Sequence, residues 1–156
     1  MNEKVLRKEL IELLKGGQAH STLEEVLKDL SPELCNKQPQ EGIRSAYEEL
    51  EHMRLAQEDI LKYSVDPSWE SPEWPDGFWP LDSDEMTEEV LENSVSGFFS
   101  DLDELIALVR NSEINLMSQI PHGEKGHTYL REILLVADHN AYHLGKIVRT
   151  LVQVSE

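Results

Sequence analysis

Two histidines four residues apart, His139 and His143, are the side chains of this chain best placed to do chemistry. They lie in the segment LLVADHNAYHLGKIV, and positions i and i+4 of a helix share one face. A third histidine, His52, lies in a separate helical segment, EELEHMRLAQEDIL. If these two helices pack side by side, three neutral imidazole nitrogens converge on one divalent metal ion.

The number of protein ligands decides what such a site does. Structural zinc sites usually have four protein ligands, whereas catalytic sites keep a position open for water or substrate. The HxxxH spacing lacks the glutamate that acts as general base in HExxH motifs. His20 is the first candidate for a fourth ligand, although we interpret it as a residue that ends or caps a helix. Glu48 and Glu132 are candidate acceptors for the ring N–H groups of the ligands, although we interpret both as solvated surface acids. The residues alone leave a catalytic and a structural site open.

Four long segments with helical spacing of apolar residues position these histidines, and no period-2 alternation is long enough to predict a sheet. Four amphipathic helices of this length predict an all-α fold, an antiparallel four-helix bundle. Such bundles commonly build metal sites from side chains on facing helices. We interpret Gly145 as a point of close helix–helix approach. The predicted long helices run approximately over Glu3–Lys15, Gly42–Tyr63, Thr87–Arg110 and Thr128–Val154.

Shorter signals refine the helix boundaries. Gly16 and Gly17 end the first helix, as glycines often do. Ser21 or Thr22 is expected to cap a short helix, TLEEVLKDL, that stops at Ser31-Pro32. Ser83 or Asp84 is expected to cap the third long helix.

Between the second and third long helices lies the segment SVDPSWESPEWPDGFWPLDSDEM. Its prolines prevent a continuous helix, and its aromatic residues argue against a disordered linker. We expect an ordered loop that packs across one end of the bundle. Its aromatic side chains are interpreted as packing residues rather than a substrate wall; they are Trp69, Trp74, Phe78 and Trp79.

Composition narrows the classes of function. The 156 residues include 14 Lys+Arg and 31 Asp+Glu, a formal net charge of −17, so we expect no affinity for nucleic acid phosphates. No segment approaches 18 consecutive apolar residues, which argues against a membrane span. With Cys35 as its one cysteine, the chain forms no internal disulfide, and we expect a single domain, residues 1–156, in the cytoplasm.

Three other residues are weaker candidates. His122 and His127 flank a glycine-containing turn before the last helix and are interpreted as exposed loop histidines. Cys35 has no basic neighbour in sequence that would lower its pKa, so we interpret it as structural rather than nucleophilic.

The segments around the three histidines, ADHNAYHLGKIV and EELEHMRLAQEDIL, resemble the DinB-like family of four-helix bundles. Further segments extend the resemblance over nearly the whole chain, among them LLKGGQAH, SPEWPDGFWP and IPHGEKGHTYLREILLVADHNAYHLG. That family has one histidine on its second helix and an HxxxH pair on its last. The resemblance therefore implies that His52, His139 and His143 bind a divalent transition metal, zinc, nickel or iron, in a homodimer.

The same resemblance suggests what the site acts on. The wider superfamily includes transferases and isomerases that use low-molecular-weight thiols such as bacillithiol and mycothiol. It implies a metal-dependent enzyme with a small-molecule substrate, either a thiol S-transferase or a hydrolase that activates water. The alternative is a non-catalytic, stress-related bundle in which the metal joins two helices.

Overall fold

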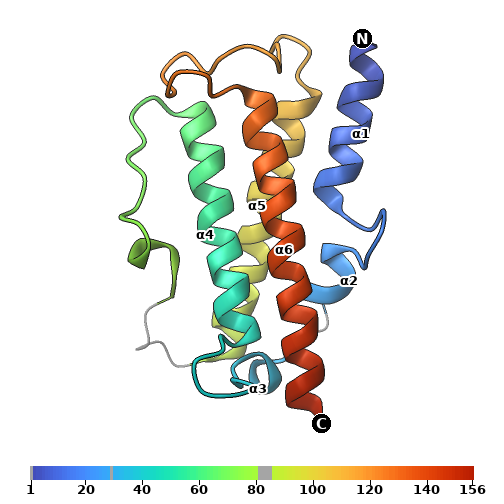
Figure 1. Cartoon of the computed structure of the whole chain (residues 1–156), viewed down its shortest axis with the longest axis vertical. Helices are drawn as coiled ribbons and strands as arrows, with labels where there is room; N and C mark the ends of the chain where they lie inside the picture. The colour runs from blue at the N-terminus through green and yellow to red at the C-terminus, as the bar shows by residue number, and fades with distance from the viewer. Residues whose placement is uncertain (1, 29, 81–85) are drawn as a thin grey trace.

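The computed structural model describes residues 2–28, 30–80 and 86–156 (Figure 1). Helices make up the regular structure of these residues, and none of them forms a strand. The only β-type pairings among them are two isolated bridges, Gly16–Thr22 and Gln119–Thr128. The elements are α1 (Glu3–Lys15), α2 (Leu23–Leu27), α3 (Pro32–Cys35), α4 (Ala46–Val65), the 3-10 turn η1 (Asp76–Phe78), α5 (Glu88–Arg110) and α6 (Tyr129–Ser155).

Hydroxyl side chains fix the starts of the helices. Thr87 and Thr128 each accept a hydrogen bond from the backbone N–H three residues further on, which satisfies a donor that the helix leaves free. Ser45 does the same for α4, and Thr22 for α2, as predicted. Thr87 takes the role expected of Ser83 or Asp84, which lie outside the described residues.

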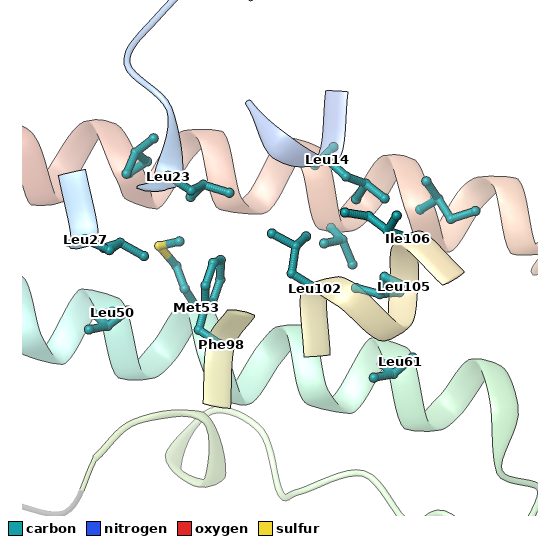
Figure 2. Packing of buried hydrophobic residues seen from close by; sticks show 14 of the residues in the cluster. Leu14, Leu23, Leu27, Leu50, Met53, Leu61, Phe98, Leu102, Leu105 and Ile106 are labelled. Atoms are coloured by element: carbon teal, nitrogen blue, oxygen red, sulfur yellow. The ribbon is translucent and has the colours of Figure 1, made fainter. Parts of the chain in front are cut away.

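The long helices pack through buried leucine, isoleucine, phenylalanine and methionine side chains (Figure 2). Leu14 of α1, Met53 of α4 and Phe98 of α5 are almost fully buried, and the apolar face of α6 packs against the same core. Burial of such side chains supplies most of the energy that holds helices together. The core thereby holds α4 against α6, the two helices that carry the three histidines.

Two helix pairs differ in direction. Along α4 and α6, Glu49 contacts His143 and Gln57 contacts Asn140, so these helices are antiparallel. Along α4 and α5, Gln57 donates a hydrogen bond to the carbonyl oxygen of Phe98. The next residue, Glu58, lies near Asp101, where burial first and then the charge of Glu58 raise the pKa of the Asp101 carboxyl. The residue numbers of the contacting pairs rise in the same direction along the two helices, so α4 and α5 are parallel. The antiparallel prediction is wrong for this pair.

The Pro/Trp-rich connection explains the parallel pair. It is ordered over residues 66–80, but it returns alongside α4 (Figure 1) instead of crossing one end of the molecule as predicted. Trp69 anchors it through its indole N–H, which donates to Asp59 at 2.8 Å. A connection that returns along α4 lets α5 start near the N-terminal end of α4 and run in the same direction as α4.

One turn of helix was not predicted, and one smaller prediction is wrong. α3 is a single turn that the apolar pattern did not indicate, since four residues are too few for a period to be visible. Gly145 is exposed, and a Cβ there would meet no atom within 4 Å, so close helix approach does not explain this glycine. Among the described helices, none combines the length and apolar character needed to cross a membrane.

Candidate metal centre

The three predicted histidines converge between α4 and α6. Each of His52, His139 and His143 offers one ring nitrogen, and these atoms lie within 4.8 Å of one another. The Nε2 atoms of His52 and His139 are 3.1 Å apart. The antiparallel packing of the two helices brings together residues 87 positions apart, while the i, i+4 spacing keeps the pair on α6 on one face.

Fixed acceptors set which ring nitrogen of two histidines carries the proton. His52 Nδ1 lies 2.7 Å from the carbonyl oxygen of Phe78, and because a carbonyl only accepts, Nδ1 carries the hydrogen. His143 Nδ1 likewise donates to Glu49 Oε2 at 2.5 Å. With the hydrogen on Nδ1, the Nε2 atom of each ring keeps its lone pair whenever that ring is neutral. Metal-binding histidines commonly donate their other ring N–H to a carbonyl or carboxylate oxygen in this way.

The donor set fits a divalent transition metal. Two nitrogens bound tetrahedrally to one zinc ion at 2.0–2.1 Å would be roughly 3.3 Å apart, close to the 3.1 Å between His52 and His139. Burial lowers the pKa of His139 to about 4, and the neighbouring histidines add to this shift. Burial likewise lowers the pKa of His52. His52 and His139 are therefore neutral near pH 7, the state in which imidazole binds a metal.

An aromatic ring and a charged pair lie against the cluster. Trp79 stacks on His52 with ring centroids 4.0 Å apart and planes within 7°, and the guanidinium of Arg44 lies over Trp79. Lys146 Nζ lies 3.3 Å from the second oxygen of Glu49. Burial raises the pKa of Glu49, but the hydrogen bond from His143 and the charge of Lys146 outweigh it, so the pKa is lowered. Glu49 is thus a buried carboxylate that stays charged beside the histidines.

Comparison with known protein families identifies the chain at this point. The DinB superfamily matches residues 17–147, a stretch that contains all three histidines. The chain belongs to the DinB superfamily. No curated protein and no solved structure matches it.

In this DinB superfamily chain, the acceptor for a ligand N–H is not one of the two predicted acids. Glu48 closes the capping box of α4 with Ser45, and Glu132 lies beside Arg131. Glu49 takes the role instead. Spacing along α4 gave no signal that singles it out, because Glu48 and Glu49 both lie one helical turn before His52, and Glu49 bonds to His143 of α6 instead.

The remaining histidines and the cysteine of this DinB superfamily chain lie outside the cluster. His20 is exposed and its ring bonds to the carbonyl of Ser21. His127 and His122 bond to the hydroxyl and the carbonyl oxygen of Tyr63, respectively. Cys35 is fully buried, and burial raises the pKa of its thiol to about 11, which suits the structural role predicted for it.

Proposed function

We propose that His52, His139 and His143 hold a divalent transition metal, zinc, nickel or iron, in a catalytic site for a small-molecule substrate. The observation that carries this proposal is the cluster itself: three nitrogens lie within 4.8 Å, and among the described residues no fourth histidine, cysteine or acidic ligand joins the group. Three protein ligands leave room for a substrate or water. We interpret the four long helices as the four-helix bundle of the DinB-like type.

The carboxylate beside the cluster is poorly placed to act as a base, which favours a reactant that the metal itself activates. Glu49, the carboxylate in contact with the cluster, is occupied by His143 and Lys146, so it is poorly placed to accept a substrate proton. When bound, a divalent ion would favour the deprotonated, nucleophilic form of a thiol. We therefore place a low-molecular-weight thiol S-transferase first, and a hydrolase that activates water second.

The surrounding residues then act by holding the ligands. Phe78 O and Glu49 keep the protons of His52 and His143 on Nδ1, so that both Nε2 atoms face the ion. Trp79 covers one face of His52 and keeps water from that face. A purely structural role for the metal is less well supported, because the expected fourth ligand, His20, bonds elsewhere.

Metal analysis of purified variants tests the ligand set. His139→Ala and His143→Ala should each abolish stoichiometric binding of zinc or nickel, since two ligands hold an ion far more weakly than three. His122→Ala, which changes a histidine outside the cluster, is the matched control and should keep full metal content. Full occupancy in either α6 variant would refute the ligand assignment.

A spectroscopic titration tests the chemistry. In the cobalt-substituted protein, a millimolar low-molecular-weight thiol should produce a sulfur-to-cobalt charge-transfer band. A spectrum that does not change with thiol, in a protein that binds cobalt stoichiometrically, would exclude the transferase and leave the hydrolase.

A further inference from the structure

A pocket lined by cationic side chains adjoins the histidine cluster. It lies between the residues preceding α4 and the C-terminal half of α6, has a volume of about 420 Å³ and is lined in part by Arg44, Lys146 and Arg149. That volume falls within the range of small-molecule sites. The chain has 14 basic residues against 31 acidic ones, and three of the basic side chains line this pocket.

The charges of this pocket do not cancel. Arg44 pairs with Glu48 at 2.6 Å, and Lys146 pairs with Glu49 at 3.3 Å. Arg149 is exposed and makes no hydrogen bond or ion pair with any residue that the structure describes. Three cations and two carboxylates leave one positive charge. An anionic group of a ligand would balance this charge.

Two chains of contacts join the pocket to the histidines. Arg44 lies over Trp79, which stacks on His52. Lys146 bonds to Glu49, which accepts from His143. Each chain passes through one intervening side chain, and one of these, Glu49, itself lines the pocket.

We infer that this cationic pocket binds a carboxylate of the substrate, and that the substrate class is a carboxylate-bearing low-molecular-weight thiol. The thiol part of this inference rests on the proposed function. Arg149 supplies the unpaired guanidinium, whose planar donors match a carboxylate, and Lys146 adds a second positive charge. The pocket would hold one end of the substrate while its sulfur reaches the cluster.

The first test needs no metal. Protein labelled with ¹⁵N is titrated with succinate at constant ionic strength, and the arginine Nε–H signals are followed, with that of Arg44 as the readout. Saturable shifts are expected in the wild type, and Arg149→Gln should weaken the affinity about tenfold or more. Arg110→Gln, which removes an exposed arginine that ends α5 and does not line this pocket, should not change it.

Several outcomes of this titration would overturn the pocket assignment. Shifts that never saturate, or an affinity unchanged by Arg149→Gln, would show that succinate does not use the pocket. Inorganic phosphate binding more tightly than succinate would overturn the choice of a carboxylate.

The second test separates the two proposals. Cobalt-loaded protein is titrated with mercaptosuccinate and with 2-mercaptoethanol, which lacks the carboxylates. The pocket predicts that mercaptosuccinate binds at least tenfold more tightly and that Arg149→Gln removes this advantage without changing the affinity for 2-mercaptoethanol. Equal binding of both thiols, insensitive to Arg149→Gln, would refute the carboxylate pocket and keep the thiol site. Succinate binding without any thiol signal would refute the thiol chemistry and keep the pocket.

Discussion

Replacing Glu49 by glutamine tests whether the metal centre depends on its buried carboxylate. Glu49 is 4% exposed, accepts the Nδ1–H of His143 at 2.5 Å and pairs with Lys146. Glutamine has nearly the same shape and can still accept the Nδ1–H through its carbonyl oxygen. The substitution therefore removes the negative charge that makes His143 a stronger ligand, together with the ion pair to Lys146.

The size of the expected effect follows from two independent magnitudes. A hydrogen bond to a charged group contributes about 1.5–3 kcal/mol, of which a neutral acceptor retains part. Substitution of outer-shell partners of metal ligands weakens metal binding about 10- to 100-fold, which corresponds to about 1.4–2.7 kcal/mol. The two ranges overlap, so we expect Glu49→Gln to lower zinc affinity by about 10- to 100-fold.

Competition with a chromogenic chelator at pH 7.5 measures this change. Glu48→Gln is the matched control, because Glu48 is the neighbouring residue but closes the capping box of α4. The control should lose some helix stability and keep its metal affinity. The reasoning is refuted if Glu49→Gln binds zinc within twofold of the wild type, or if both variants weaken binding equally.

Three further predictions follow from other parts of the structure. Burial above all lowers the pKa of His52, and it lowers that of His139 to about 4. Because histidines of the unfolded chain have a pKa near 6.5, the unfolded chain binds more protons than the folded one below that pH. The free energy of unfolding of the metal-free protein, measured by urea denaturation, should therefore fall as the pH is lowered from 6.5 to 5. Gly145→Ala should stabilise α6 by up to about 1 kcal/mol, seen as a rise in Tm of about 2–4 °C, because a Cβ there meets open space. Cys35 should resist a thiol-specific disulfide reagent at pH 8 in the native protein and react once the protein is unfolded, because it is buried and its pKa is raised to about 11.

Each of these three has a contrary result that would count against it. A pH slope unchanged by His139→Phe would assign the lost stability to other groups. A lower Tm for Gly145→Ala would mean that this face of α6 packs against something in solution. Rapid native-state labelling of Cys35 would mean that α3 opens readily.

The sequence predicted the helices better than their directions. Apolar spacing and Gly16 placed α1 at its observed bounds, because periodicity and end signals are local properties. The same periodicity marks which face of a helix is buried and is blind to which way the helix runs. The parallel packing of α4 and α5 depends instead on the path of the connection between them, which has no period to read.

The candidate metal centre also has parts that the sequence predicts and parts that it does not. His139 and His143 were predictable from their i, i+4 spacing, and the structure brings His52 to them. Glu49 was not predictable from spacing, because Glu48 and Glu49 both lie one helical turn before His52, and only the capping geometry separates the two. The carbonyl of Phe78 was not predictable, because any residue offers a carbonyl and only the backbone path selects this one.

The departure from an antiparallel arrangement and the completeness of the site have one physical cause. α4 has 20 residues and is about 30 Å long, and the chain from 66 to 87 is long enough to return over that length, since extended chain covers about 3.3 Å per residue. A short turn after Val65 would suffice for an antiparallel neighbour, but it would bring no backbone near His52, which lies in the second turn of α4. The returning segment brings Phe78 O to His52 Nδ1 and Trp79 onto its ring. The connection that makes α5 parallel to α4 is therefore also the element that fixes the tautomer of one candidate ligand and shields its face.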